Sequence, residues 1–255
     1  MRTRRWGLSF LAVTKGKAME SFGALAEKLA TACRLLYMEG LMDHGGLVGA
    51  RIPETGNIVL NPREMRGTPG RHPGLMSAED MVVVDPGGKR IQGSNNPPSE
   101  TPIFTGVFAA RPDVMAVFHL HLQYATLFSV VGKPLQPIGV TGAPFGTIVA
   151  VHQDPTLIQR PEQGVALART LGDNLAVILR GHGAVIVGTS IEEAFAASVM
   201  FEDNALRQFR ASQIGTPRPL EGSELAEARA QICHPKVTAK MWGFYLMKAK
   251  ADGII

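Results

Sequence analysis

The sequence is poor in cysteine, with Cys33 and Cys233 as the two cysteines in 255 residues. Neither has a neighbour in a C-x-x-C motif, so the chain contains no disulfide framework of the kind that holds small secreted domains together. We expect both thiols to be buried in a cytoplasmic protein.

Long apolar runs are also missing. No segment approaches the roughly 20 apolar residues that a membrane-spanning helix needs, so we expect no membrane partner. The run of residues 6–13 follows a basic start but is too short to span a membrane. No convincing small-residue cleavage site comes after it. We expect residues 1–20 to be a disordered extension, with a weak signal peptide as the alternative, and residues 21–255 to form one domain.

The sequence has no large excess of either positive or negative charge. The chain has 26 Lys and Arg against 22 Asp and Glu, a net charge of +4. Much of the excess lies in residues 2–17 and 63–71. So small and dispersed an excess does not indicate a nucleic-acid partner, but it suits a small anionic substrate. Repeats, low-complexity tracts and domain linkers are absent as well.

The apolar periodicity predicts a mixture of strands and helices. We expect strands at residues 50–52, 57–60, 81–84, 89–92, 114–121, 176–179 and 184–187. We expect helices at residues 21–40, 101–110, 123–130, 161–171 and 191–213, and a helical tail over 222–255 broken at Pro235. The strict alternation of a Rossmann chain is missing, so the pattern favours one α/β domain.

Two irregular segments stand out before residue 80. A glycine-rich turn at residues 44–49 can bring backbone N–H groups close to an anion, or can be a plain tight turn into a strand. The loop at residues 61–74 carries Arg63, Arg66 and Arg71. Loops of that length in compact domains are usually functional or mobile.

The strongest chemical signal is Phe118-His119-Leu120-His121 at the end of an expected buried strand. Residues i and i+2 of a strand point to one face, about 7 Å apart. The two imidazoles therefore suit a metal, or are simply polar residues with satisfied hydrogen bonds. His182, between two glycines after another strand, would complete a three-histidine site with open metal positions. Its alternative is an ordinary turn residue.

Glu100 lies just before the expected helix at residues 101–110, where Ser99 is the expected N-cap. An acidic residue in the first turn of a helix is favourable for the helix dipole alone. On local grounds Glu100 can be either a structural or a chemical residue.

Taken together, these motifs resemble the class II aldolase/adducin family. The resemblance covers residues 22–211 and includes the glycine-rich turn, the P-x-S-E segment at 97–100, the R-P-D-V-x-A-V-x-H-x-H block at 111–121 and R-G-H-G at 180–183. Glu100 precedes His119 by 19 residues, and His182 follows His121 by 61, as in the aldolase pattern.

The resemblance implies a single-domain α/β/α layered fold with a central, mainly antiparallel sheet flanked by helices. It implies that His119, His121 and His182 hold one divalent metal ion per subunit. Zinc is the expected ion, with manganese or cobalt as alternatives. It also implies that Glu100 is the acid/base carboxylate beside the open metal position.

Family members are commonly homotetramers with active sites at subunit interfaces. The resemblance therefore implies that the C-terminal tail supplies an aromatic residue across the interface, and Tyr245 is the best match. The alternative for Tyr245 is simple packing beside Trp242.

The departures from the family pattern concern the substrate. Sugar-phosphate members carry a G-N-[VI]-S turn and paired serines before the glutamate, whereas this chain has Gly46-Leu47-Val48-Gly49 and Pro98-Ser99. An apolar Leu47 cannot pair with a phosphate, so we expect a substrate without one. Candidate residues for binding a substrate carboxylate are Ser99, His44, Arg66 and Arg71. Arg51 and Arg63 are further candidates. For any one of these basic residues, a solvated surface charge is the favoured interpretation.

The resulting prediction is a divalent-metal-dependent carbon–carbon lyase. It decarboxylates a hydroxylated aromatic carboxylate through a metal-stabilised enolate. Retro-aldol cleavage uses the same logic and is the main alternative, followed by epimerisation or dehydration. A non-catalytic adducin-like interaction module is the rival from another class, but such a module is expected to lack the intact histidine triad.

Overall fold

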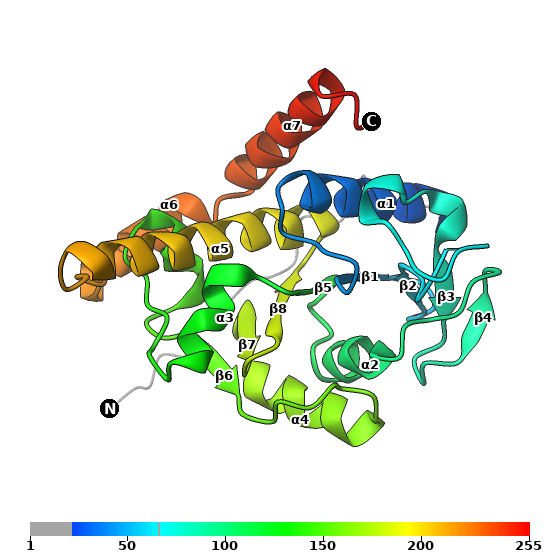
Figure 1. Cartoon of the computed structure of the whole chain (residues 1–255), viewed down its shortest axis with the longest axis horizontal. Coiled ribbons are helices and arrows are strands. Elements are labelled where there is room, and N and C mark those ends of the chain that lie inside the picture. Colours follow the sequence, from blue (N-terminus) through cyan, green and yellow to red (C-terminus); the bar gives the residue numbers. More distant parts are fainter. Residues whose placement is uncertain (1–21, 66) are drawn as a thin grey trace, which may run out of the picture.

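The computed structural model describes residues 22–65 and 67–255, arranged around one sheet (Figure 1). The expected extension at residues 1–20 and the substrate candidate Arg66 lie outside the described residues. The helices are α1 (Phe22–Met38), α2 (Thr101–Ala110), α3 (Gln123–Val130), α4 (Pro161–Leu171), α5 (Ile191–Ile214), α6 (Gly222–Ile232) and α7 (Pro235–Ala251). The strands are β1 (Leu47–Arg51), β2 (Ile58–Leu60), β3 (Val82–Val84), β4 (Arg90–Gln92), β5 (Ala116–Leu120), β6 (Ala150–His152), β7 (Ala176–Leu179) and β8 (Gly183–Gly188).

All eight strands form one sheet in the order β4-β3-β2-β1-β5-β8-β7-β6. Every neighbouring pair is antiparallel except β6 and β7, which are parallel. The prediction of an α/β fold with a central, mainly antiparallel sheet is confirmed. Among the described residues, no helix combines the length and apolarity needed to cross a bilayer.

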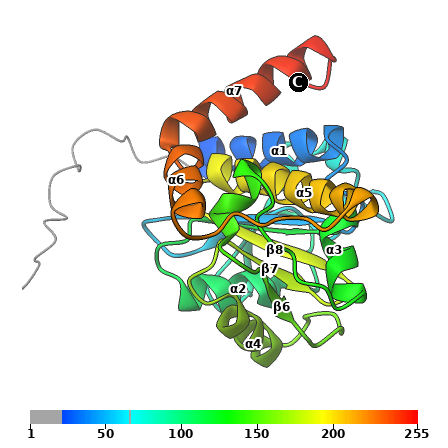
Figure 2. The same cartoon turned by 90° about the vertical axis from the view of Figure 1, so that its left-hand side faces the viewer.

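Side chains of β5 alternate between two apolar cores. Ala116, Phe118 and Leu120 pack into the core shared with α1 and α5. Val117 packs into the opposite core, with α2 and α4. Figures 1 and 2 show the resulting layers, with α1 and α5 over one face of the sheet, α2 and α4 over the other, and α7 outside the α1–α5 layer. Because strand side chains alternate, His119 projects to the α2 side.

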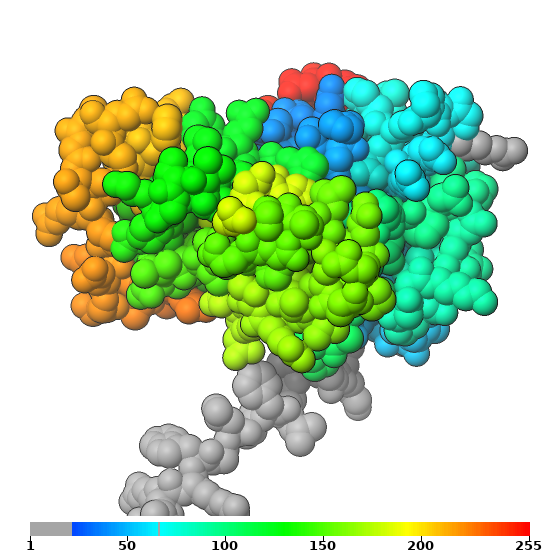
Figure 3. Space-filling model, turned by 60° about the horizontal axis from the view of Figure 1, so that its bottom comes forward, coloured from blue at the N-terminus to red at the C-terminus, as the bar shows by residue number. Residues whose placement is uncertain are grey.

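Helices α2 and α4 approach each other through glycine. A Cβ on Gly106 would collide with the backbone of Gly164, and a Cβ on Gly164 would collide with the carbonyl of Pro102. The two backbones are therefore in direct contact, which only glycine allows. Figure 3 shows the α4 segment in the middle of this face of the molecule. The contact sets the position of α2, whose N-terminus carries Glu100.

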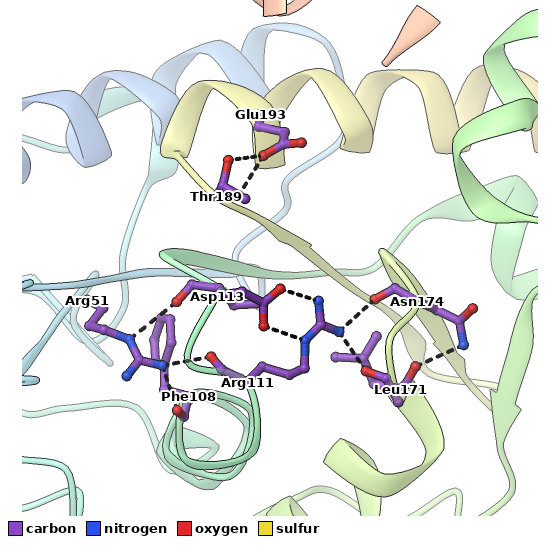
Figure 4. A network of polar contacts seen from close by, with 10 residues as sticks. Arg51, Phe108, Arg111, Asp113, Leu171, Asn174, Thr189 and Glu193 are labelled. Carbon is purple, nitrogen blue, oxygen red and sulfur yellow. Dashed lines mark hydrogen bonds and ion pairs between the residues drawn. The ribbon is translucent and has the colours of Figure 1, made fainter. Parts of the chain in front are cut away.

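A polar network joins the start of β5 to its neighbours (Figure 4). Arg51 donates from Nε to the carbonyl of Val114 at 3.2 Å and from Nη2 to the carbonyls of Phe108 and Arg111. Arg111 pairs with both carboxylate oxygens of Asp113, at 2.8 and 2.7 Å. Arg51 is therefore committed to backbone carbonyls, and the expectation that it could meet a substrate carboxylate is wrong.

Several local expectations also need correction. Residues 47–49 were expected in a turn but form the start of β1, because Leu47 and Val48 are buried and pair with β5. The three-residue strand β6 was not predicted. Cys33 is buried, and burial raises the pKa of its thiol to about 12, but Cys233 is exposed.

Candidate metal centre and active site

His119 is the most buried member of the candidate site, at 0% exposure within β5. Its Nδ1 lies 3.2 Å from the carbonyl oxygen of Ala184 on the neighbouring strand β8. A carbonyl only accepts hydrogen bonds, so Nδ1 carries the proton and Nε2 keeps a free lone pair. The sheet thus fixes both the ring orientation and the tautomer of this histidine.

His121 lies just beyond the end of β5 and is held by a side chain instead. Its Nδ1 is 3.0 Å from Oδ2 of Asp43, in the turn before β1. Burial raises the pKa of Asp43, but hydrogen bonds with His121 and Gly45 outweigh it, so the net pKa is below the ordinary value. The ionised carboxylate accepts from Nδ1–H and again leaves Nε2 free. Asp43 was not among the predicted site residues.

His182 comes from the tight turn between β7 and β8. The turn is closed by the N–H of His182, which donates to the carbonyl of Leu179 at 3.0 Å. Gly181 has a φ of 67°, which the turn requires and which side chains disfavour. The Gly181 N–H donates to Oγ of Ser129 at 3.0 Å, so α3 anchors the turn. The prediction of a turn residue and that of a candidate metal ligand are therefore compatible.

The three predicted histidines converge, with one ring nitrogen from each lying within 4.8 Å of the others. The Nε2 atoms of His119 and His121 are buried without any hydrogen-bond partner. Burial and then the neighbouring histidines lower the pKa of His119 well below its ordinary value, and they lower that of His182 to about 4. All of this fits a divalent cation, which requires neutral imidazoles with free lone pairs.

Glu100 lies beside this cluster. Its Oε2 is 3.8 Å from Nε2 of His119, and its Oε1 accepts from the N–H of Ile158 at 3.2 Å. It occupies the N-cap position of α2 without accepting a capping hydrogen bond, so the expectation that Ser99 caps this helix is wrong. Burial raises the pKa of Glu100, although the Ile158 N–H, His121 and Arg71 oppose that rise.

Of the predicted substrate-binding residues, Arg71 lies near Glu100, whereas His44 and Ser99 are exposed. Arg71 is close enough to lower the pKa of Glu100, and it donates to the carbonyls of Gly45 at 2.8 Å and Pro62 at 2.6 Å. His44 adjoins Asp43 but its side chain is 90% exposed. Ser99 is exposed next to Glu100, and its Oγ accepts from Gln159 at 3.5 Å.

Tyr245 lies on α7, outside the layer formed by α1 and α5 (Figure 2). Its ring packs edge-on against the rings of Phe195 and Phe244, with ring centroids 5.1 Å apart in each pair. Trp242 contacts the same Phe195 ring at 5.4 Å. Within one chain, Tyr245 is therefore a packing residue of α7 and is not among the residues grouped around the histidines.

Gly49 stands where sugar-phosphate members of the family carry a serine, and neighbouring side chains fill the space beside it. A Cβ on Gly49 would lie 2.5 Å from Cδ2 of Leu60 and 2.6 Å from Cδ1 of Phe104. Leu47, across from His119 in the β1–β5 pairing, is buried in the same core as Phe104. Apolar side chains thus fill the strand where sugar-phosphate members have asparagine and serine.

Comparison with known proteins gives the family. The model of the Class II Aldolase and Adducin N-terminal domain matches residues 27–209, and the chain belongs to this family. A 3,4-dihydroxyphthalate decarboxylase of Arthrobacter keyseri is 28% identical over 79% of this chain and 84% of its own length. The meiotically up-regulated gene 14 protein of Schizosaccharomyces pombe is 31% identical over 75% of this chain and 67% of its own.

Solved structures agree with this assignment. An L-fuculose 1-phosphate aldolase from Glaciozyma antarctica PI12 superposes with a TM-score of 0.80 at 25% identity, covering 94% of this chain and 95% of that one. Relatives of this chain include 3,4-dihydroxyphthalate decarboxylases and L-fuculose phosphate aldolases, so the prediction of a class II aldolase-family lyase is confirmed at that level.

Proposed function

We propose that this protein is a divalent-metal-dependent carbon–carbon lyase that decarboxylates a non-phosphorylated, hydroxylated aromatic carboxylate. The observation that carries the proposal is the convergence of three histidines with two orphaned Nε2 atoms beside a buried carboxylate. Buried polar atoms without partners are costly unless something binds them. We take zinc as the ion, one per subunit, with manganese or cobalt as alternatives.

His119, His121 and His182 would hold the ion through ring nitrogens. A divalent cation at this place supplies a Lewis acid that stabilises the negative charge left when CO2 departs. The chain's own contribution is to hold the rings of His119 and His121 in a fixed orientation, through the contacts of their Nδ1 atoms with the Ala184 carbonyl and the Asp43 carboxylate.

Glu100 manages the proton that replaces CO2. Burial raises its pKa, so its carboxyl group holds a proton at a higher pH than an exposed glutamate would. The Ile158 N–H binds Oε1 and leaves Oε2 facing the histidine cluster. Oε2 is therefore the atom from which we expect the proton to move to the substrate carbon.

The substrate class follows from what the site offers in place of a phosphate pocket. Packing around Gly49 leaves no room for a serine hydroxyl, and Leu47 offers no hydrogen bond. The resemblance to a 3,4-dihydroxyphthalate decarboxylase supports an aromatic carboxylate. Arg71 contributes positive charge close to Glu100 and Asp43, which favours an anionic substrate. Ser99, His44 and Arg66 remain our candidates for direct contacts with it.

Retro-aldol cleavage of an unphosphorylated hydroxy-carbonyl compound is the second candidate. It is favoured by the overall similarity to L-fuculose 1-phosphate aldolases and requires the same cation and the same proton manager. We also propose a homotetramer with active sites at subunit interfaces. There Tyr245 of one subunit would serve the site of its neighbour, because within its own chain it lies outside the α1–α5 layer.

The test combines metal analysis with product detection. Purified protein is loaded with Zn2+, Mn2+ or Co2+ and offered 3,4-dihydroxyphthalate and related hydroxylated aromatic carboxylates, and CO2 release is followed. L-fuculose, which is an aldol without a phosphate, is offered in parallel. CO2 release that requires the metal supports the decarboxylase proposal. A metal-loaded protein that instead cleaves an unphosphorylated aldol would move the assignment to the second candidate, and a protein that binds no metal would refute both.

A further inference from the structure

We propose that Asp43 is a positioning residue that fixes the tautomer and the orientation of His121, a candidate metal ligand that lies beyond the end of its strand. The inference rests on the proposed metal site but not on the reaction carried out there. Asp43 and His121 are 78 residues apart in sequence, and their contact joins the turn before β1 to the end of β5.

The two oxygens of the Asp43 carboxylate have separate tasks. Oδ1 accepts from the backbone N–H groups of Gly45 at 2.8 Å and Gly46 at 3.0 Å, which closes the turn. Oδ2 accepts from Nδ1 of His121 at 3.0 Å. The turn thus aims one oxygen at the ring, whose Nε2 is buried without a hydrogen-bond partner. A ligand histidine whose other nitrogen binds a carboxylate is a recurrent arrangement in metal sites.

The turn is shaped around the ring of His121. A Cβ on Gly45 would lie 2.9 Å from Nδ1 of His121 and closer still to its Cε1. The carbonyl of Gly45 accepts from Nη2 of Arg71 at 2.8 Å, so Arg71 holds the turn from its other side. Asp43, Gly45 and Arg71 together leave the His121 ring little freedom, although the ring itself lies on a loop.

The requirement for a carboxylate is specific. Asparagine has one acceptor oxygen, whereas this position uses one oxygen to accept from the turn and a second oxygen to accept from His121. If the amide oxygen kept the turn closed, the NH2 group would face Nδ1 and favour the His121 tautomer with the proton on Nε2. That tautomer cannot bind a cation through Nε2. Asp43→Asn should therefore harm metal binding at least as much as Asp43→Ala, although it is the more conservative change.

The first experiment measures Zn2+ affinity by competition with a chromogenic chelator, using the full chain. We expect a loss of about 10- to 100-fold in Asp43→Ala and a loss at least as large in Asp43→Asn. Asp85→Asn is the matched control. Asp85 also closes a turn by accepting from two backbone N–H groups, at Gly87 and Lys89, but none of the hydrogen bonds described for it involves a histidine. It should bind Zn2+ like the wild type.

A second pair of variants tests the shape of the turn. Gly45→Ala should weaken Zn2+ binding, because the new methyl group displaces the His121 ring. Gly139→Ala should not, because nothing lies within 4 Å of a Cβ at that position. Wild-type affinity in both Asp43 variants would overturn the proposal.

A third measurement begins with the wild type, so its main outcome does not depend on whether a variant folds. In metal-free wild-type protein at pH 8.5, 15N spectra of the imidazole groups should show His121 with its proton on Nδ1. Asp43→Asn should shift this signal toward the Nε2–H form, and Asp85→Asn should leave it unchanged. A His121 that carries its proton on Nε2 in the wild type would refute the proposal. Failure of the wild type to bind Zn2+ would instead refute the proposed function, while the tautomer measurement still decides the role of Asp43.

Discussion

The two ends of β5 carry two polar clusters with opposite character. At its start, Arg51 and Arg111 are tied to backbone carbonyls and to Asp113, and their contacts join β1, α2 and the loop after α4 (Figure 4). At its other end, His119 and His121 each use one ring nitrogen for a structural hydrogen bond and leave the second one buried and unpaired. One strand thus joins a completed network to an incomplete one.

This difference distinguishes polar side chains that stabilise the fold from polar side chains that are available to bind a ligand. Both clusters contain charged or titratable groups, and both are partly buried, so composition and burial do not tell them apart. What distinguishes them is satisfaction of hydrogen bonds. A buried polar atom without a partner costs stability, and a protein retains such atoms where a ligand completes them. The following changes should therefore affect metal binding at one end of β5 and stability at the other.

The largest effect is expected from His119→Ala, which removes a metal ligand. Zn2+ affinity should fall by at least about a hundredfold, more than for loss of a residue behind a ligand, and turnover should disappear with it. Equilibrium competition for Zn2+ measures the first and CO2 release the second. His152→Ala is the control, because His152 is a buried strand histidine bonded to Thr170. Equal metal loss in both variants would contradict the assignment.

Glu100→Gln should separate metal binding from chemistry. Its side-chain oxygen can still accept from Ile158, so Zn2+ affinity should change by no more than a few fold. The amide cannot transfer the proton, so kcat should fall by about 10²- to 10⁴-fold. Glu193→Gln is the control. The Glu193 carboxylate accepts from the N–H of Thr189, which follows the C-terminal end of β8, whereas His182 precedes the N-terminal end of that strand. This variant should retain full turnover. Full activity in Glu100→Gln would refute the acid/base role.

At the start of β5, Arg51→Met should reduce stability without touching the metal. The variant keeps an apolar stem but removes the donors for the carbonyls of Phe108, Arg111 and Val114. We expect the free energy of unfolding of the metal-free protein to fall by about 1–3 kcal/mol, measured with urea. Zn2+ affinity should be unchanged. A variant that unfolds normally but loses metal would show that the two ends of β5 are coupled.

The smallest effect is expected from Asp113→Asn. The Arg111 guanidinium holds the pKa of Asp113 below its ordinary value, but the Asp113 side chain is 56% exposed. Solvent screening therefore limits the loss to about 0.2–1 kcal/mol near pH 7. Because the folded pKa is the lower one, this contribution exists above the unfolded pKa and disappears as the pH falls through the folded value. Thermal melts of wild type and variant should converge in acid.

Most of the fold was predictable because its signals are local, and the centre of the site was predictable because its motifs resemble those of a known family. The helices at residues 101–110, 123–130 and 161–171 have the predicted bounds, since glycine, proline and apolar spacing mark both ends. His119, His121 and His182 carry a spacing that the family resemblance makes recognisable. Strand β6 has three residues and no alternation long enough to detect, so its pairing with β7 depends on tertiary context.

Asp43 shows what the sequence could not reveal. An aspartate before two glycines predicts a closed turn, and Asp85 has similar local surroundings and likewise accepts from the N–H group two residues further on. What distinguishes Asp43 is a histidine 78 residues away, and a contact of that kind depends on the β1–β5 pairing. Glu100 illustrates the converse, because an acidic residue at the start of a helix suggested a helix-stabilising role, while its side chain turns to Ile158 and His119.

The direct contact between Gly106 and Gly164 has a practical consequence for engineering. Helix α2 bears Glu100 at its N-terminus, and the segment leading into α4 supplies the Ile158 N–H that holds the same carboxylate. A methyl group at either glycine would push the helices apart and shift the acid relative to the histidines, without changing any residue that touches substrate. A library meant to alter substrate preference should therefore leave these two positions fixed, while a library meant to retune the distance between acid and metal should begin with them.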